Sequence, residues 1–194
     1  LNKIHDIKTT MNISPIRKNF ISYSLLAVFS FFINYYFANL GLHPIDTFSF
    51  FESGYLITQG YHPVKDFWVI SGIVVDYLQA LFFLVFGNNW NSYIFHSSIV
   101  NSLISVLFLF FLNNFNKNPI LNLLLSFSFA VLCYPVSGTP FPYQHSYIFS
   151  LASMIFFYLA VSKEKKVYWF VLPILMFLAF FSMQMPSGII IVLI

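Results

Sequence analysis

The sequence alternates long apolar runs with short polar stretches, and this pattern constrains the fold more than any other feature. A helix needs about 20 apolar residues to cross the hydrocarbon core of a bilayer. Runs that reach or approach this length cover residues 21–40, 93–112, 120–134, 147–161 and 167–182, and a further apolar run ends the sequence. Only 8% of the residues are charged, whereas soluble domains contain roughly 25%. The sequence therefore predicts an all-α integral membrane protein, a polytopic helical bundle.

The charge of the chain excludes one class of partner. A formal net charge of +3 is too small and too scattered to form a nucleic-acid-binding surface. We expect membrane lipids around the chain and no nucleic acid. Cys133 is the single cysteine and lies in an apolar run, so that no intrachain disulfide can form and a buried thiol is expected.

The basic residues predict the orientation in the membrane. Lysine and arginine favour the cytoplasmic side, and four of them precede the first apolar run, at Lys3, Lys8, Arg17 and Lys18. The N-terminus is therefore predicted to be cytoplasmic. The first span then delivers the chain to the extracytoplasmic face, where residues 41–92 form an external loop.

Residues 73–86 decide the topology of everything that follows. As a helix they would span only about 21 Å, and Asp76 and Gln79 interrupt the apolar run. If they crossed the membrane, Lys117 and the lysines at 163–166 would lie outside; if they lay along its surface, these lysines would lie inside. We therefore predict a second juxtamembrane helix here, and residues 134–145 become a second external loop.

The first external loop gathers most of the acidic side chains. It contains four of the six carboxylates, at Asp46, Glu52, Asp66 and Asp76. A membrane protein that concentrates ionisable groups beside the bilayer is expected to present a site there. We therefore take residues 41–92 as the candidate active site, on the extracytoplasmic face.

Asp46 is well placed to cap a short helix over residues 47–59, with Gly60 as its end. Phe48 and Tyr55 recur on its apolar side, so that the helix is amphipathic and is predicted to lie along the membrane surface. The Asp46 carboxylate could equally accept a proton from an attacking hydroxyl or hold a divalent metal, and these roles are compatible with a cap.

The other acids of the loop differ in their expected surroundings. Glu52 is turned roughly 120° away from Asp46 around the helix, so that these two need not share a proton and Glu52 is expected on a solvated face. Asp76 stands in an apolar run. A partly buried acid at such a position has a partner or a function.

Lys65 and Asp66 could bind a phosphate and its counter-charge, with His62 beside them, although simple snorkelling of Lys65 at the membrane surface is an equally good interpretation. His62, His96 and His145 all fall on the external side of the predicted topology. No two of them have metal-ligand spacing on one helix, so that a metal site is only weakly indicated.

Several sequence motifs of the external loop, taken in their order along the chain, resemble the start of the GT-C glycosyltransferases that use polyprenyl-phosphate sugars. This group includes lipid A aminoarabinose transferase, protein mannosyltransferases and Rgt-type sugar transferases. These motifs are DTFSFFESGYLITQG, YHPVKDF and YLQALFFLVFGNNW, and a later one is FFSMQMPSG. The resemblance covers about residues 20–190 in pattern, and the external loop carries most of it. It implies a GT-C-like bundle with amphipathic juxtamembrane helices in the first external loop.

By this resemblance Asp46 matches the acid regarded as catalytic, and Lys65, Asp66, His62, Glu52, Asp76 and His145 become candidate substrate-binding residues. The chain departs from the family at two places. Ser71 and Gly72 stand where relatives often have a His before Gly, and the second external loop has no acid between Pro135 and His145. Only Tyr143 and His145 could replace that acid.

The preferred interpretation is a membrane glycosyltransferase of a bacterial inner membrane. It would transfer one sugar, with inversion or retention, from a polyprenyl-phosphate donor to an extracytoplasmic glycolipid or surface-polysaccharide acceptor. We expect residues 1–194 to be the N-terminal part of a longer transmembrane domain. The alternatives are a lipid-linked oligosaccharide flippase or other transporter, which needs charged or broken helices near the membrane centre, and a non-catalytic membrane protein.

Overall fold

The computed structural model describes residues 20–41 and 46–194, apart from the side chains of Asp46 and Val136. Its described part is built from α-helices and one short 3₁₀ turn. The helices are α3 (Phe20–Phe37), α4 (Asp46–Thr58), α5 (Val74–Phe86), α6 (Trp90–Phe115), α7 (Pro119–Cys133), α8 (Pro142–Lys163), α9 (Lys166–Ser182) and α10 (Gln184–Leu193), and the 3₁₀ turn η1 covers Val136–Gly138. The predicted all-α class is confirmed.

Polar caps between the apolar runs set the helix ends. The Asn89 side chain accepts a hydrogen bond of 2.9 Å from the Ser92 amide at the start of α6, and Asn118 accepts one of 3.1 Å from the Leu121 amide at the start of α7. Asn side chains satisfy the free amides of a first helical turn in this way. Gly87 ends α5 with a φ of +84°, a backbone conformation that glycine adopts without steric cost.

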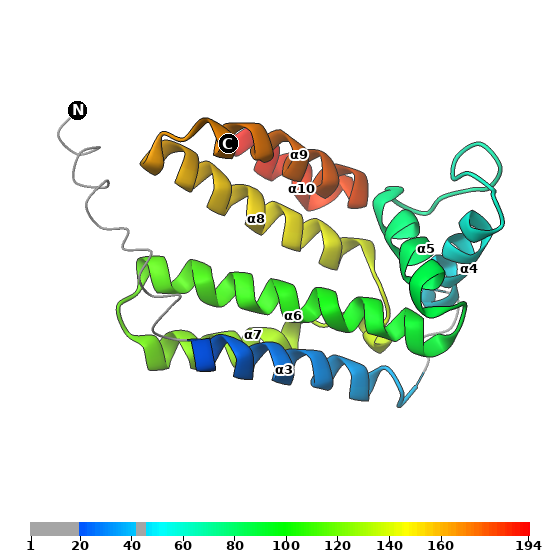
Figure 1. The fold of residues 1–194 in the computed structure, drawn as a ribbon, viewed down its shortest axis with the longest axis horizontal. Helices are drawn as coiled ribbons and strands as arrows, with labels where there is room; N and C mark the ends of the chain where they lie inside the picture. Colours follow the sequence, from blue (N-terminus) through cyan, green and yellow to red (C-terminus); the bar gives the residue numbers. More distant parts are fainter. Residues whose placement is uncertain (1–19, 42–45) are drawn as a thin grey trace.

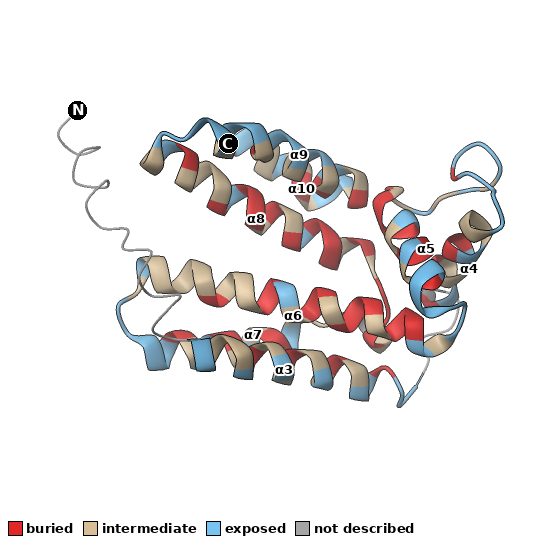
Figure 2. Cartoon of the chain, in the orientation of Figure 1, coloured by how far each residue is buried: buried red, intermediate tan, exposed pale blue. Residues whose placement is uncertain are grey.

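The long helices form two packed layers (Figure 1). In one layer α3 packs against α6 and α7, and in the other α8 packs against α9 and α10. The contact between α6 and α8 joins the layers. Figure 2 shows that the buried residues of α6 concentrate in its half nearer to α4 and α5.

Three of the described helices are long and apolar enough to cross a membrane, namely Phe20–Phe37, Trp90–Phe115 and Pro142–Lys163. The chain is therefore an integral membrane protein by length and composition of its helices. The other two predicted spans correspond to α7 and α9, which have 15 and 17 residues and are shorter than a typical span.

The second predicted external loop is partly wrong. Residues 142–145 were expected in a loop, but α8 begins at Pro142 and includes Tyr143, Gln144 and His145. Proline fits the first position of a helix because its missing amide hydrogen would have no partner there. His145 consequently lies inside the bundle, where its side chain is fully buried.

Helices α4 and α5 lie together at one end of the bundle, beside the C-terminal end of α3 and the N-terminal end of α6 (Figure 1). Their bounds agree with the two predicted short helices at residues 47–59 and 73–86, although α4 begins at Asp46 itself. Gly60 follows α4 with a φ of +90°, as expected for the residue that ends a helix. Their position relative to a lipid surface stays a prediction.

The interior of the bundle is polar as well as apolar. The Ser30 hydroxyl donates to the Asn101 backbone carbonyl at 2.9 Å, and the Asn101 side-chain amide donates back to the Ser30 backbone carbonyl at 3.0 Å. The Asn34 side-chain amide donates to the Ser98 hydroxyl at 2.9 Å. Such paired hydrogen bonds between α3 and α6 hold membrane helices together where lipid supplies no hydrophobic driving force between them.

Candidate functional site

The α4–α5 pair is attached to α6 by an aromatic core. Phe50 of α4, Val75 and Phe83 of α5 and Tyr93 of α6 form one buried cluster. Gly54 allows the two short helices to cross closely, because a Cβ atom there would lie only 2.7 Å from the Gln79 Cγ. This close crossing brings residues of α4 next to the first turn of α5.

Asp76 is buried at this crossing and is only 3% exposed. Its Oδ1 accepts a hydrogen bond of 2.5 Å from the Ser53 hydroxyl. Burial raises the pKa of the Asp76 carboxyl to about 6, and the bond from Ser53 opposes this rise in part. A carboxyl with such a pKa changes its protonation close to physiological pH, which is a property of acid–base groups in active sites.

A pocket of about 300 Å³ opens beside Asp76. Two acids are among its lining residues, which come from α4, α5 and the segment between them: Ser49, Phe50, Glu52, Ser53, Leu56, Phe67, Trp68, Val69, Ile70 and Asp76. None of these is a lysine or arginine. The pocket can therefore present two carboxylates together with hydroxyl groups and aromatic side chains, which suits a neutral or cationic polar ligand better than an anion.

The beginning of α4 is fixed to α6 by one buried hydrogen bond. The Tyr93 hydroxyl donates to the Thr47 carbonyl at 2.7 Å, and Tyr93 is completely buried. Thr47 is the residue after Asp46. The Asp46 side chain, the predicted catalytic acid, lies outside the described residues.

Lys65, Asp66 and His62 form a separate group on the α4–α5 connection. The Lys65 ammonium lies 3.7 Å from Asp66 Oδ1 and its side chain is 75% exposed. Asp66 Oδ2 accepts a hydrogen bond of 2.8 Å from the His62 amide. None of the three lines the pocket beside Asp76. Lys65 is therefore held next to a carboxylate that partly neutralises it.

His145, also a predicted binding residue, lies away from this pocket and contacts His96. Their Nε2 atoms are 2.9 Å apart and both rings are buried. His145 Nδ1 lies 2.7 Å from the Phe141 carbonyl oxygen, and His96 Nδ1 lies 2.8 Å from Gln79 Oε1. Sequence reasoning missed this pair, because spacing on a single helix does not detect two histidines 49 residues apart.

A metal site was weakly indicated by the sequence. Within residues 20–41 and 46–194, no three His, Cys, Asp or Glu side chains come together as a metal centre requires. The two histidines that do meet direct their Nε2 atoms at each other, 2.9 Å apart. The pocket beside Asp76 is the better candidate for a functional site.

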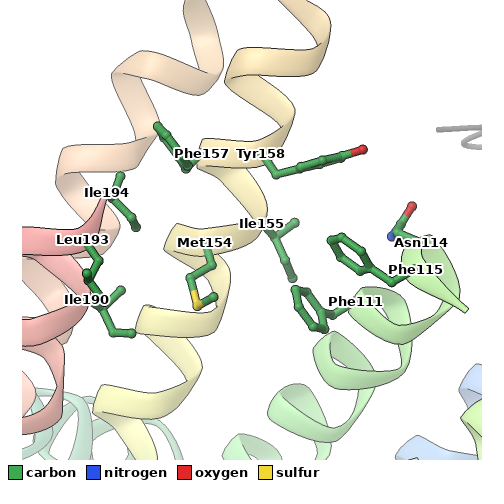
Figure 3. A pocket seen from close by; sticks show the side chains of 10 residues that line it. All are labelled: Phe111, Asn114, Phe115, Met154, Ile155, Phe157, Tyr158, Ile190, Leu193 and Ile194. Carbon is green, nitrogen blue, oxygen red and sulfur yellow. The ribbon is translucent and has the colours of Figure 1, made fainter. Parts of the chain in front are cut away.

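Two apolar cavities lie along the bundle. A groove of about 830 Å³ is lined mainly by α6, α7 and α8, and Tyr134, Tyr143 and Tyr147 are among its lining residues. A second cavity of about 330 Å³ lies towards the other end of the bundle. Figure 3 shows Phe111 and Phe115 of α6 facing Ile155 of α8 there. Both cavities are suited to hydrocarbon.

No protein-family model matches this chain, and neither a curated protein nor a solved structure matches it.

Proposed function

We propose that this chain is the membrane-embedded part of a glycosyltransferase. It transfers a sugar from a polyprenyl-phosphate donor to an acceptor outside the cytoplasm, such as a glycolipid or a surface-polysaccharide precursor. The observation that carries the proposal is the α4–α5 pair. It stands between the first and second candidate spans and holds a pocket with Glu52 and the buried Asp76. This arrangement agrees with the GT-C-like external loop that the sequence resembles.

The proposed reaction is a displacement at the anomeric carbon of the donor sugar. Asp46 accepts the proton of the acceptor hydroxyl, and the acceptor oxygen forms a bond to the anomeric carbon. The bond between that carbon and the phosphate oxygen breaks, and its electron pair leaves with the polyprenyl phosphate. Glu52 and Asp76 bind sugar hydroxyl groups, because carboxylates accept strong hydrogen bonds from them.

The phosphate of the donor is assigned to the Lys65 side of the loop. The pocket beside Asp76 has no basic lining residue, so that it would repel a phosphate. Lys65 is exposed, and an ammonium on a flexible stem reaches lipid phosphates at the membrane surface. His62 and Asp66 orient the same short segment. His145 is buried and is assigned to the packing of α6 against α8.

The groove between α6, α7 and α8 supports a lipid-linked donor. Its volume of about 830 Å³ and its lining of Ile104, Phe108 and Leu151 suit several isoprene units. Apolar contact of this kind is non-directional and roughly proportional to the area removed from water. A groove of this kind therefore tolerates a long, flexible prenyl chain better than a rigid ligand.

The proposed orientation places α4 and α5 outside the cytoplasm of a bacterial inner membrane, with the N-terminus inside. Lys117 lies between α6 and α7, and Lys163, Lys165 and Lys166 lie around the α8–α9 connection. Both connections are at the end of the bundle opposite to α4 and α5 (Figure 1). Basic residues collected at one end favour that end for the cytoplasm.

A lipid-linked oligosaccharide flippase or another transporter is the second candidate. The observation in its favour is the pair His96 and His145, because ionisable side chains inside a helical bundle commonly mark a substrate or ion pathway. A flippase moves the lipid-linked sugar without breaking its glycosidic bond. A non-catalytic membrane protein would do neither.

The deciding experiment measures transfer of a radiolabelled sugar from a short-chain polyprenyl phosphate by the intact protein in membranes. Asp46→Asn keeps a capping oxygen but removes the ionised carboxylate, and we expect transfer to fall by about 100-fold or more. Glu164→Gln, in the α8–α9 connection, is the matched control and keeps its activity. Wild-type transfer by Asp46→Asn would exclude Asp46 as the base, and transport without transfer by the wild type would favour the flippase.

A further inference from the structure

The segment that joins α4 to α5 is a folded tip and not an irregular loop. The Val64 amide donates to the Phe67 carbonyl at 3.0 Å, and the Asp66 amide donates to the His62 carbonyl at 2.9 Å. Asp66 Oδ2 also accepts the His62 amide at 2.8 Å. These bonds hold Val64 at a φ of +71°, which a β-branched residue rarely adopts. The chain thus maintains a costly turn at this point.

The turn exposes large apolar side chains, which lie outside the candidate membrane spans. We call Tyr61, Val64, Trp68 and Ile70 the apolar tip; their exposed fractions are 52%, 73%, 86% and 63%. Between them Phe67 and Val69 are half-buried and line the pocket beside Asp76. The outward side chains are therefore displayed by a fixed backbone. Apolar surface of this size in water is unfavourable.

Two contacts place Gly72, at the end of the segment that carries the apolar tip, beside the end of α9 and near the start of the candidate span α8. The Gly72 amide donates to the Ser182 carbonyl at 3.2 Å at the end of α9, and a Cβ atom on Gly72 would lie 1.7 Å from the Phe181 oxygen. The Ser146 hydroxyl, in the second turn of the candidate span α8, donates to the Met183 carbonyl at 3.3 Å. Trp68 is four residues before Gly72, a reach of at most about 14 Å.

We propose that the apolar tip inserts into the boundary between headgroups and acyl chains of the adjacent leaflet. Its chemistry fits this layer, because Trp and Tyr concentrate at membrane–water interfaces. The Lys65 ammonium, 75% exposed and one residue after Val64, is placed to meet lipid phosphates. Val64 and Ile70 supply aliphatic surface for the acyl chains. The tip then attaches the α4–α5 pair to the membrane, whereas the contacts of α5 with α6 and α9 attach the pair to the helical bundle.

This attachment determines where the pocket beside Asp76 lies relative to the membrane surface. Trp68 and Ile70 belong both to the apolar tip and to the lining of that pocket. Insertion of the tip therefore brings the rim of the pocket to the membrane surface, where a ligand with a lipid tail arrives by lateral diffusion. The inference concerns lipid contact alone and does not depend on the proposed transferase activity.

The test uses the intrinsic fluorescence of Trp68. The chain has three tryptophans, so that Trp90→Phe together with Trp169→Phe leaves Trp68 as the single reporter. The protein is reconstituted into vesicles of phosphatidylcholine and phosphatidylglycerol, with part of the phosphatidylcholine brominated near the glycerol end of its acyl chains. We expect the brominated lipid to quench most of the Trp68 emission and aqueous iodide to quench little of it.

The two other tryptophans provide matched controls. Trp169 on α9 is 49% exposed, and as the single reporter it is expected to respond to brominated lipid. Trp90 is half-buried against Phe48 and Tyr93, with ring centroids 6.2 and 5.5 Å away. Quenching of Trp68 by iodide and not by lipid would place the tip in water and overturn the proposal. Protection of Trp68 from both quenchers would mean that protein covers the tip, and it would overturn the proposal equally.

A second measurement avoids any substitution of the packed Trp90. In a Cys133→Ser background, Trp68→Cys carries an environment-sensitive fluorophore, and Lys65→Cys provides a neighbouring reference at the headgroups. We expect the emission at position 68 to shift to the blue when detergent is replaced by bilayer, and to be quenched by the brominated lipid. An emission typical of water at position 68 in the bilayer would contradict insertion.

Discussion

His96 Nε2 lies 2.9 Å from His145 Nε2, and this contact joins the two layers of the bundle through α6 and α8. The surrounding acceptors determine how the protons are arranged. His145 Nδ1 faces the Phe141 carbonyl, which can only accept, so that His145 carries its proton on Nδ1. Its Nε2 is then an acceptor, and His96 Nε2 must donate to it.

His96 can donate from Nε2 in the neutral state only if its Nδ1 accepts from Gln79. This requires the Gln79 amide to present its nitrogen to the ring, the reverse of the placement with Oε1 at 2.8 Å. Amide orientation is assigned from such networks, and in the assigned placement the Gln79 nitrogen is buried without a partner. With the Gln79 side-chain amide reversed, each hydrogen bond is donated in one direction, from Gln79 to His96, from His96 to His145 and from His145 to the Phe141 carbonyl. The lone pairs of the two Nε2 atoms then no longer face each other.

The first prediction is that the two histidines are energetically coupled. His96→Leu and His145→Leu each leave the partner ring unsatisfied, and each is expected to lower stability by about 1–3 kcal/mol. The double variant should lose less than the sum, by a coupling of roughly 0.5–1.5 kcal/mol, as for hydrogen bonds between membrane helices. The measurement is a double-mutant cycle of unfolding in mixed micelles. His62→Leu, on the exposed connection, is the control, and strictly additive losses would contradict the contact.

The second prediction concerns the pH dependence that Asp76 imposes. Its folded pKa of about 6 lies above the ordinary value of 3.8, so that folding favours the protonated form. The associated stability is fully present below about pH 4 and is lost as pH rises to about 6. The loss is of the order of 2–3 kcal/mol for this buried group.

Asp76→Asn removes the free-energy cost of ionising the buried carboxyl, because the Asn side chain carries no charge. Its amide oxygen still accepts the hydrogen bond from the Ser53 hydroxyl. We expect the variant to be more stable than the wild type at neutral pH and to lack the decline between about pH 4 and pH 6. Thermal unfolding followed across this range is the measurement, with the exposed Glu52→Gln as the control. An unchanged pH profile in Asp76→Asn would mean that Asp76 is ionised without cost in the folded protein.

The third prediction is that Tyr93 positions the start of α4. Tyr93→Phe keeps the ring within the cluster of Phe50, Val75 and Phe83 but leaves the Thr47 carbonyl without the bond of 2.7 Å. If Asp46 is the base, kcat should fall while KM for the donor stays nearly constant, because only the transition-state geometry is disturbed. Stability should fall by about 1 kcal/mol. Tyr77→Phe, on an exposed side chain of α5, is the control; equal kinetics of the two variants would assign Tyr93 to packing alone.

The fourth prediction concerns topology. In a Cys133→Ser background, Asn88→Cys lies between α5 and α6, and Lys117→Cys lies between α6 and α7. We expect a membrane-impermeant thiol reagent to label position 88 from the extracytoplasmic side and position 117 from the cytoplasmic side. Only α6 separates the two positions, and its 26 residues are long enough for one crossing. Labelling of both positions from one side would mean that α6 does not cross.

The sequence by itself determined most of the helices, because these depend on local patterns, although it placed the start of α8 five residues too late. Apolar runs of near-membrane length marked the three helices that can span a bilayer, and Gly60 marked the end of α4 through turn chemistry that needs no distant partner. Length and polarity separated α4 from the spans, whereas the surface position of α5 was predicted from the positions of Lys117 and the lysines at 163–166 and stays a prediction. The sequence also identified Asp76 as unusual, because an acid in an apolar run is unusual wherever the run lies.

Only the tertiary structure decided which of these residues meet. Ser53 reaches Asp76 because Gly54 lets α4 approach α5, and His96 reaches His145 because α8 begins at Pro142 and carries that ring into the bundle. Periodicity gives the face of a helix on which a residue lies but not the rotation and depth at which that face meets another helix. Those are set by side-chain packing between segments far apart in the chain, and so the pocket, the histidine pair and the Tyr93 anchor could not be predicted from spacing.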